Sequence, residues 1–326
     1  MSDLLNFQSI LSSPIEGYIY EKKSVGYKFQ KGIAMLKRFD RFVQLWNLKD
    51  ISLPKELVVD WTNRTPNETI SNQCHRISLL RGLAEYMNRL GYNAYVYPRA
   101  LVTVNRYSYI PYIFSEEEIR SILNVCDYYP QTKLSPHRHL ILPLIIRMLY
   151  ACGLRISEAL SLTVDDVNLK EGTLLVTETK FGKERLIPMP ASLVKMCGKY
   201  RMKVLADKEN DYPFYPSPYG GHYSSSTIYW LFREILWKAG ISHSGKGPRL
   251  HDIRHTFAVH CLKKWVIEER DLSNCLPYLS IYLGHEDIRG SQRYLRLTAD
   301  LYPDITAKVE ETCSWLIPEV KSNETD

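Results

Sequence analysis

Residue types that can handle a phosphodiester recur in four short segments after residue 150. The segments are GLRISE from Gly153, TKFGKER from Thr179, RLHDIRH from Arg249 and LGH from Leu283. Tyr294 follows the histidine of the last segment by nine residues. Together they supply arginines, lysines, histidines and a tyrosine in a fixed order. Such a set can neutralise a phosphate, move protons and form a covalent bond to phosphorus.

Two arginines suit the charge that develops when a tyrosine attacks a phosphodiester. Negative charge builds on the non-bridging oxygens, and a planar guanidinium binds such oxygens in pairs while it stays protonated. We assign this clamp to Arg155 and Arg254. The departing 5′-oxygen needs a proton, and Lys180, in a predicted hairpin, is placed to supply it.

Histidines and an acidic residue complete the predicted site. A free phenol has a pKa of about 10, so Tyr294 needs a base at neutral pH, and we assign that role to His251. His285 is expected to donate a hydrogen bond to a phosphate oxygen. Glu158 is expected to orient its cationic neighbours, although its spacing from Arg155 also fits a simple helix ion pair.

Two metal-dependent alternatives use histidine pairs. His251 and His255 have the spacing of a zinc-peptidase helix, but Asp252 replaces the glutamate base and Arg254 would stand beside the metal. HRH at residues 137–139 suggests a nicking relaxase, yet it precedes a predicted buried helix and does not lie on a strand. A DNA-binding protein without catalysis is a third alternative, and the complete set of polar residues argues against it.

In this order, the four segments resemble the tyrosine recombinase family of phage integrases, chromosome-dimer resolving recombinases and transposon-encoded recombinases. The resemblance covers about residues 112–317, and the front of the chain matches less strongly. TKFGKER departs from the family's glycine-rich GKGxKxR, which leaves Lys183 as a second candidate general acid. The matched positions are Arg155, Glu158, Lys180, His251, Arg254, His285 and, as the nucleophile, Tyr294.

The resemblance implies a mainly α-helical fold with a small β-sheet. A helical, SAM-like core-binding domain is expected over residues 1–110 and a catalytic domain over 111–326. The implied activity is site-specific recombination of double-stranded DNA, in integration, excision or transposition, through a 3′-phosphotyrosyl intermediate and without a cofactor or metal. Four protomers, all alike or shared with related recombinases, are expected on two DNA sites. A type IB topoisomerase, which shares this chemistry, is the alternative.

Composition fits a globular protein of the cell interior. Hydrophobic residues make up 45% and charged residues 24% of the chain, and the seven cysteines are never spaced as CxxC, which argues for a reducing compartment. The sequence shows no export signal and no apolar run that could span a bilayer. With the resemblance, this predicts a cytoplasmic, nucleoid-associated protein of a prokaryote, phage or mobile element.

Positive charge is concentrated at the front of the chain. Residues 1–112 carry 15 Lys and Arg against 9 Asp and Glu, whereas the remaining residues carry 27 of each sign. This asymmetry favours a front domain that contacts a polyanion, although a solvated basic surface would give the same count.

Hydrophobic spacing predicts a helical front domain. Residues 29–46 and 71–90 carry apolar side chains at helical intervals, while 96–111 lacks that period and predicts an extended linker. The residues expected to face inward are Met35, Phe39, Phe42 and Trp46 in the first helix and Ile77, Leu80, Leu83 and Met87 in the second.

The elements behind the linker must position the site. Ser115 and Glu118 form a capping box that opens a helix through Cys126, and residues 173–190 alternate as a hairpin. Further helices are predicted over residues 139–152, 227–239, 252–264, 276–283 and 303–316, the last with an apolar face able to dock into a neighbouring protomer.

Overall fold

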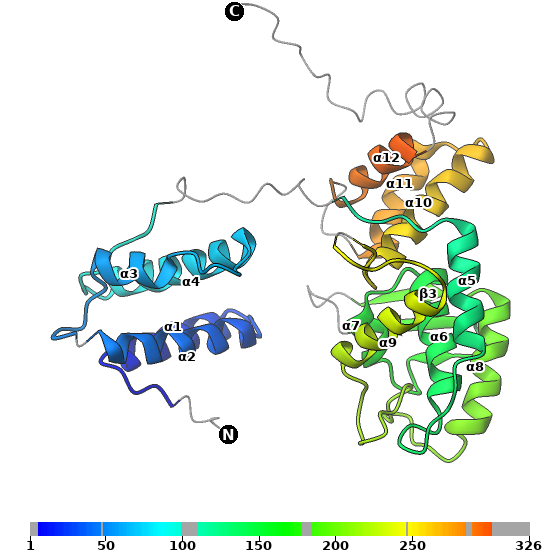
Figure 1. The fold of residues 1–326 in the computed structure, drawn as a ribbon, viewed down its shortest axis with the longest axis horizontal. Helices are drawn as coiled ribbons and strands as arrows, with labels where there is room; N and C mark the ends of the chain where they lie inside the picture. The colour runs from blue at the N-terminus through cyan, green and yellow to red at the C-terminus, as the bar shows by residue number, and fades with distance from the viewer. Residues whose placement is uncertain are drawn as a thin grey trace, which may run out of the picture. The chain divides into compact units, whose positions relative to one another are not determined.

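The chain folds as two compact units, Met1–Tyr109 and Ile110–Asp326. The computed structural model (Figure 1) describes residues 6–46, 48–98, 110–177, 184–245, 247–284 and 289–301. Both units are mainly helical, and a small sheet lies in the back unit. The predicted fold class, mainly α with a small sheet, is therefore confirmed.

Helices pack around a core of their own in the front unit. Leu36, Phe39 and Leu83 are fully buried there. The hydroxyl of Thr69 begins the longest helix by accepting a hydrogen bond from the backbone N–H of Asn72. The described helices are α1 (Ser12–Ser24), α2 (Gln30–Leu45), α3 (Lys55–Thr62) and α4 (Ile70–Arg89).

Of the two apolar helix faces predicted in this unit, one is confirmed. The other is wrong, because the buried stripe lies part of a turn around the helix from the predicted one. All four residues predicted to face inward on α4 are buried. On α2 only Phe39 of the predicted set is buried, and Met35, Phe42 and Trp46 are half-buried. The prediction followed the largest side chains, whereas the buried stripe is set by aliphatic residues around Phe39: Ile33, Leu36 and Val43.

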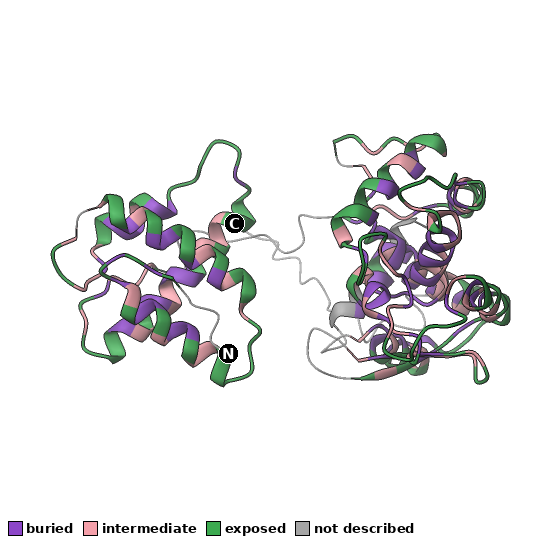
Figure 2. Cartoon of the chain, turned by 90° about the horizontal axis from the view of Figure 1, so that it is seen from below, coloured by how far each residue is buried: buried purple, intermediate pink, exposed green. Residues whose placement is uncertain are grey.

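Helix α6 (Arg138–Ala151) lies at the centre of the back unit. It packs against α5 (Glu116–Asp127), α7 (Ile156–Ser161), α8 (Ala191–Val204) and α10 (Asp252–Ile267). Eight of its residues are buried, and Figure 2 shows residues coloured as buried gathered inside this unit. An all-round apolar helix is typical of a domain interior, so the predicted buried helix is confirmed.

The sheet is antiparallel, in the order β1 (Val167–Asn168), β2 (Thr173–Val176) and β3 (Arg185–Pro188). Val176 pairs with Arg185, so β2 and β3 form the predicted hairpin. Most of the residues that join them, 178–183, lie outside the described part of the chain.

The remaining described helices are α9 (Ser225–Lys238), α11 (Leu272–Leu283) and α12 (Arg289–Leu301). Helices α10, α11 and α12 share a separate core, in which Leu262, Leu276 and Tyr294 are buried. The helix predicted over 303–316 lies outside the described residues. In the described ranges, no helix combines the length and the apolar character needed to cross a bilayer.

Candidate active site

Arg155 and Glu158 stand together at the start of α7. The carboxylate of Glu158 accepts hydrogen bonds from the backbone N–H of Arg155 at 2.8 Å and from its Nη1 at 2.6 Å. The side chain of Glu158 is only 1% exposed, whereas that of Arg155 is 23% exposed. The carboxylate therefore fixes a guanidinium that an incoming ligand can still reach.

Glu158 binds two further arginines. Arg185 on β3 donates from Nη2 to Oε2 at 2.6 Å, and Nη1 of Arg254 lies 3.7 Å from the same oxygen. Burial acts to raise the pKa of Glu158, but hydrogen bonds from Arg185 and Arg155 outweigh it, so the pKa lies below its usual range. Three cations around one carboxylate leave positive charge that favours an anion such as a phosphate.

Arg254, in the first turn of α10, contacts two other parts of the chain. Its side chain is 2% exposed and donates from Nη1 to the carbonyl of Gly153 at 2.7 Å and from Nη2 to the carbonyl of Leu283. Burial, and then the charge of Arg155, lower its pKa to about 10. Arg254 is therefore still protonated at neutral pH.

Tyr294 lies on α12 with its side chain buried at 3% exposure. Its hydroxyl is 3.0 Å from Nδ1 of His255, and the two ring centroids are 5.6 Å apart. Burial raises the pKa of Tyr294, and the charge of Arg254, which also hydrogen-bonds the phenol, acts in the opposite direction. The phenol thus stands between an imidazole and a cation.

His251 precedes α10 and reaches solvent. Its ring packs edge to face on His255, with centroids 4.9 Å apart. Partial withdrawal from water, followed by the charges of Arg254 and Arg155, lowers the pKa of His251 to about 4. The ring is therefore neutral at physiological pH, the state that can accept a proton.

Three predicted site residues, Lys180, Lys183 and His285, lie outside the described part of the chain. The residue before His285 is described: Gly284 ends α11 with a left-handed φ of +63°. Its carbonyl accepts a hydrogen bond from Nη2 of Arg155 at 3.3 Å. The turn that leads to His285 is thereby attached to the arginine clamp.

The structure thus brings together the predicted Arg155, Glu158, His251, Arg254 and Tyr294. Sequence reasoning missed the parts played by Arg185 and His255. Both stand inside the segments that drew attention, Arg185 at the end of TKFGKER and His255 four residues after His251. Their spacing was the available signal, but only tertiary contacts reveal their partners.

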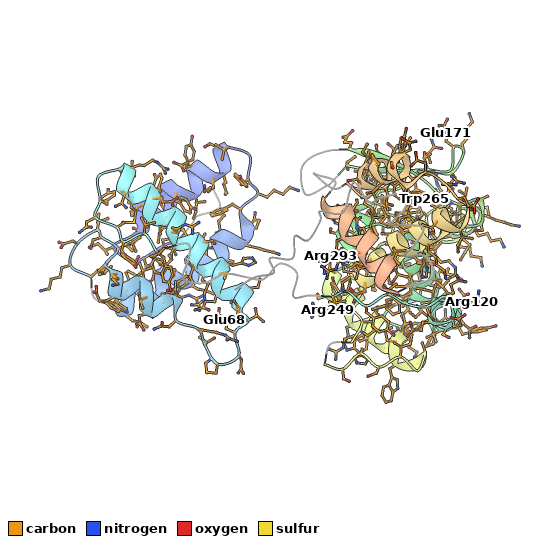
Figure 3. The ribbon with its side chains drawn as sticks, turned by 90° about the horizontal axis from the view of Figure 1, so that it is seen from above. Glu68, Arg120, Glu171, Arg249, Trp265 and Arg293 are labelled. Atoms are coloured by element: carbon orange, nitrogen blue, oxygen red, sulfur yellow. The ribbon has the colours of Figure 1, made fainter. Side chains whose placement is uncertain are left out.

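More positive charge borders this cluster. Figure 3 draws Arg249 and Arg293 on the same side of the back unit. The backbone N–H of Arg249 donates to the carboxylate of Asp252 at 2.7 Å, which secures the start of α10. The charge of Arg293 also acts to lower the pKa of Tyr294.

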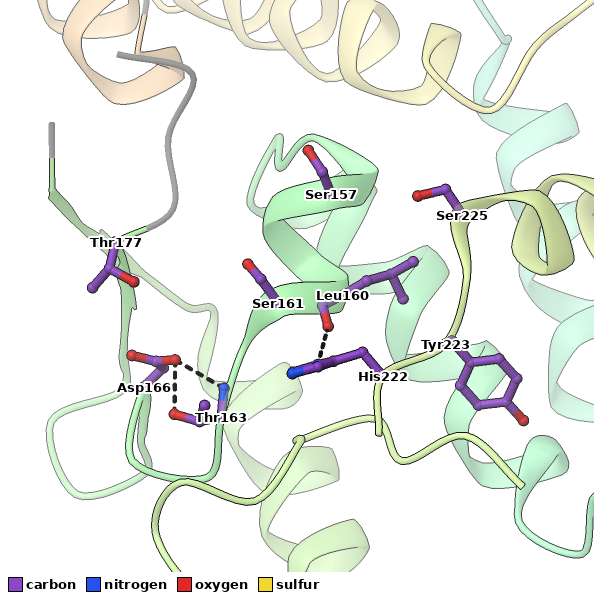
Figure 4. Close-up of a pocket in the computed structure, with 9 residues that line it drawn as sticks. All are labelled: Ser157, Leu160, Ser161, Thr163, Asp166, Thr177, His222, Tyr223 and Ser225. Carbon is purple, nitrogen blue, oxygen red and sulfur yellow. Dashed lines mark hydrogen bonds between the residues drawn. The ribbon is translucent and has the colours of Figure 1, made fainter. Parts of the chain in front are cut away.

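A separate cavity of about 550 Å³ lies beside α7 (Figure 4). Serine and threonine hydroxyls, His222 and Asp166 provide its polar lining, and no arginine or lysine is among the described residues that line it. The carboxylate of Asp166 already accepts hydrogen bonds from the N–H and hydroxyl of Thr163, both at 2.8 Å. This lining suits a phosphate poorly, so the arginine cluster remains the candidate site.

The histidine pair of the zinc-peptidase alternative is engaged in other contacts. His251 and His255 pack ring against ring, and His255 is hydrogen-bonded to Tyr294. Among the described residues, no three His, Cys, Asp or Glu side chains are grouped so that they could hold a metal ion.

Comparison with known proteins agrees with this geometry. Residues 113–300 match the phage integrase family model. The Sinorhizobium fredii protein y4rE, whose name assigns it to integrases or recombinases, is 30% identical over 300 residues, which cover 90% of this chain and 94% of that protein. Tyrosine recombinase XerD of Vibrio cholerae is 28% identical over 234 residues, covering 71% of this chain and 72% of XerD.

A solved structure of similar fold is a lambda integrase dimer bound to a COC′ core site. The TM-score is 0.61 at 18% identity, over 87% of this chain and 94% of that one. The chain belongs to the phage integrase family. It is a tyrosine recombinase, an enzyme that transfers DNA strands, and the topoisomerase alternative is not favoured.

Proposed function

We propose that this chain cleaves and rejoins duplex DNA at specific sites through a covalent bond between Tyr294 and a 3′-phosphate. One observation carries the proposal: Arg155, Arg185 and Arg254 gather on the buried carboxylate of Glu158, and Arg254 also reaches the hydroxyl of Tyr294. The cluster offers an anion site next to a nucleophile.

In the proposed reaction, the phenol oxygen of Tyr294 attacks the scissile phosphorus and the bond to the 5′-oxygen breaks. Arg155 and Arg254 bind the non-bridging oxygens as their charge grows, an effect that can reach about 10³–10⁵ in rate for one positioned arginine. A 5′-hydroxyl then attacks the phosphotyrosine and releases Tyr294. The phosphotyrosine conserves the bond energy, so neither ATP nor a redox cofactor is required.

The phenol proton needs an acceptor. His251 is the acceptor proposed from the sequence, and the hydrogen bond between the Tyr294 hydroxyl and Nδ1 of His255 makes His255 a second candidate. We favour a path in which His255 takes the proton from Tyr294, while His251, packed on its ring, connects it to solvent.

The leaving 5′-oxygen takes a proton from Lys180, with Lys183 as the second candidate, and His285 donates a hydrogen bond to a phosphate oxygen. Two contacts made by sequence neighbours of these residues support the assignment. Arg185 fixes the strand that follows both lysines, and Arg155 binds the carbonyl of Gly284 beside His285.

Double-stranded DNA is the proposed partner of both units. The excess of positive charge in residues 1–112 suits contacts with the phosphate backbone. Among proteins of similar fold, XerH has been solved bound to its difH substrate and a lambda integrase dimer bound to a core site. We propose a homotetramer on two DNA sites, in the cytoplasm at the nucleoid, that serves integration, excision or transposition.

A nicked DNA substrate tests the proposed chemistry, because the short 5′ fragment diffuses away and traps the covalent complex. The wild-type chain should give a protein–DNA band on a denaturing gel, and Tyr294→Phe should give none. Tyr278→Phe, which removes the hydroxyl of an exposed tyrosine on α11, is the matched control and should give the wild-type band. A band in Tyr294→Phe would overturn the proposal.

A further inference from the structure

The cavity beside α7 shares that helix with the arginine clamp. Arg155 is the N-cap residue of α7, and Ser157 and Ser161 on the same helix line the cavity. A helix rises about 1.5 Å per residue, so Ser157 follows Arg155 by about 3 Å along the axis, close to the roughly 3.4 Å between base pairs of DNA. A DNA strand with a phosphate at Arg155 therefore brings the neighbouring base pairs within reach of the cavity.

His222 enters this cavity with one ring nitrogen already engaged. Its Nδ1 lies 2.7 Å from the carbonyl oxygen of Leu160. A carbonyl only accepts hydrogen bonds, so Nδ1 carries a proton and donates it, and Nε2 of the neutral ring is an acceptor. In Figure 4 the ring extends toward Asp166 and Thr163, which line the same cavity. Among the described residues, none donates a hydrogen bond to Nε2.

Asp166 supplies a second acceptor. Its Oδ2 accepts hydrogen bonds from the N–H and the hydroxyl of Thr163, both at 2.8 Å. In the part of the chain that the structure describes, no donor reaches the other oxygen, Oδ1. The contacts with Thr163 hold the carboxylate in one orientation, so Oδ1 is offered to the cavity at a fixed place.

The backbone that carries His222 is held against the end of α7. The N–H of Phe214 donates to the carbonyl of Leu162 at 2.8 Å, and Pro216 pairs with His222 as an isolated bridge. Tyr223, the next residue, is only 8% exposed. The cavity is therefore built from a fixed frame, as a selective binding site requires.

The lining favours a ligand that donates hydrogen bonds. No lysine or arginine is among the described residues that line the cavity, so it does not suit a phosphate. One carboxylate and one imidazole are too few to hold a metal ion, and no larger group of metal ligands occurs in the described ranges. The donors on the base edges of DNA are amino groups, on cytosine and adenine in the major groove and on guanine in the minor groove.

We propose that His222 and Asp166 form a base-reading site that selects amino-bearing bases beside the cleaved phosphate. This inference rests on the proposed function and names the chemical feature by which the DNA site is recognised. A paired base keeps one amino hydrogen outside the base pair, and that hydrogen is donated to Nε2 of His222 or to Oδ1 of Asp166. The two acceptors thus read one base pair or two neighbouring ones.

Site selection from a random duplex library tests the proposal. Within about two base pairs of the cleaved phosphate, wild type should enrich adenine or cytosine on one strand if the major groove is read, or a G·C pair if the minor groove is read. His222→Asn keeps a side-chain N–H for the carbonyl of Leu160 but has no atom in place of Nε2. It should lose the preference at that position and keep the rest of the selected sequence. His137→Asn, the same change at an exposed histidine before α6, should select the wild-type sequence.

Asp166→Asn provides a second, independent variant. Its amide oxygen still accepts from Thr163, but an N–H₂ donor replaces Oδ1. At the position that Asp166 reads, the variant should therefore accept bases that present a carbonyl, guanine or thymine in the major groove. Where circular dichroism shows that His222→Asn does not fold, this variant carries the comparison.

Base analogues then assign the contact. Purine in place of adenine, 2-pyrimidinone in place of cytosine, or hypoxanthine in place of guanine lacks the amino group. In a gel-shift assay the analogue should weaken wild-type binding about tenfold, the usual effect of losing one base contact. The variant that lost the preference at that position should be weakened less than about threefold, because its contact is already absent.

Two results would overturn the inference and leave the proposed function intact. One is a selected sequence that is unchanged in both variants. The other is an analogue effect as large in the variants as in wild type. A wild-type chain that enriches no sequence and forms no covalent complex on nicked DNA would instead refute the proposed function.

Discussion

Nδ1 of His255 lies 3.0 Å from the hydroxyl of Tyr294, and the His251 ring packs edge to face against the His255 ring at a centroid distance of 4.9 Å. The three rings lead from solvent at His251 to the buried phenol. Since burial raises the pKa of Tyr294, the phenol does not ionise readily unless a base is in contact with it. This geometry makes His255 the first acceptor of the proton.

Replacing His255 should therefore impair the attack more than replacing His251. We expect His255→Phe to slow formation of the covalent complex by about 10²-fold or more, the usual effect of losing a general base. His251→Phe should have a smaller effect on the same step, measured in single turnover on nicked DNA. His243→Phe, in a loop of the same unit, is the control. A greater loss for His251→Phe than for His255→Phe would return the base role to His251.

The sequence shows which segments form the site but does not show which side chains meet. His251 and His255 are four residues apart and so lie on one side of the start of α10. The histidine that faces Tyr294 is decided by the packing of α10 against α12. The contact between Arg185 and Glu158 joins residues 27 positions apart and has no local signal.

The same limit applies to the fold. Helices with caps or long apolar stripes, such as α4, α5 and α6, were predicted close to their observed bounds. The predicted elements did not include α1, α3, α8 or α12. Helix α12 (RGSQRYLRLTADL) is polar overall and gains its place by burying Tyr294, Leu295 and Leu297 against α10 and α11. Tertiary packing, which the sequence pattern does not show, selects such helices.

The exposed arginine of the clamp should matter for cleavage and little for DNA binding. Arg155→Gln removes a guanidinium that is 23% exposed and hydrogen-bonded to Glu158 and Gly284. We expect cleavage to fall by about 10³-fold or more, because the charge on the phosphate oxygens is greatest in the transition state. DNA affinity in a gel-shift assay should change less than tenfold, since many phosphate contacts share the binding energy. Equal losses in the two assays would contradict a catalytic role for Arg155.

Acid should destabilise the chain partly through His251. Its pKa in the folded state, about 4, is below the ordinary value of 6.5, so between these values the unfolded chain binds a proton that the folded chain does not. The stability that depends on the neutral ring is complete above pH 6.5 and is lost as the pH falls toward 4. In urea unfolding, wild type should lose more stability between pH 7.5 and pH 5 than His251→Gln. An identical loss in both chains would argue against the lowered pKa.

Chelation of divalent metal should leave the reaction unchanged. Guanidiniums already supply the positive charge that a metal would bring to the phosphate, and the proposed acid and base are side chains. The rate of covalent-complex formation in EDTA should equal the rate in magnesium within about twofold, once ionic strength is matched, because screening alone alters phosphate binding. Loss of the complex in EDTA, restored by added metal, would favour a metal enzyme.

A methyl group at Gly284 should disturb the site as well as the backbone. Gly284 and Gly240 both follow the end of a helix with positive φ, +63° and +74°, so alanine at either position should cost about 1–2 kcal/mol in free energy of unfolding. Space around Gly240 is open, whereas a Cβ on Gly284 would meet Nη1 of Arg185 at 2.7 Å. Gly240→Ala should therefore cleave nicked DNA at the wild-type rate, and Gly284→Ala should be both less stable and at least tenfold slower, a loss of about 1.4 kcal/mol in transition-state stabilisation.

In a double-mutant cycle, Gly284→Ala and Arg185→Gln should show less than additive losses, because both act on one contact. Equal stability and equal rates for the two alanine variants would show that the contact between Gly284 and Arg185 has no part in the reaction.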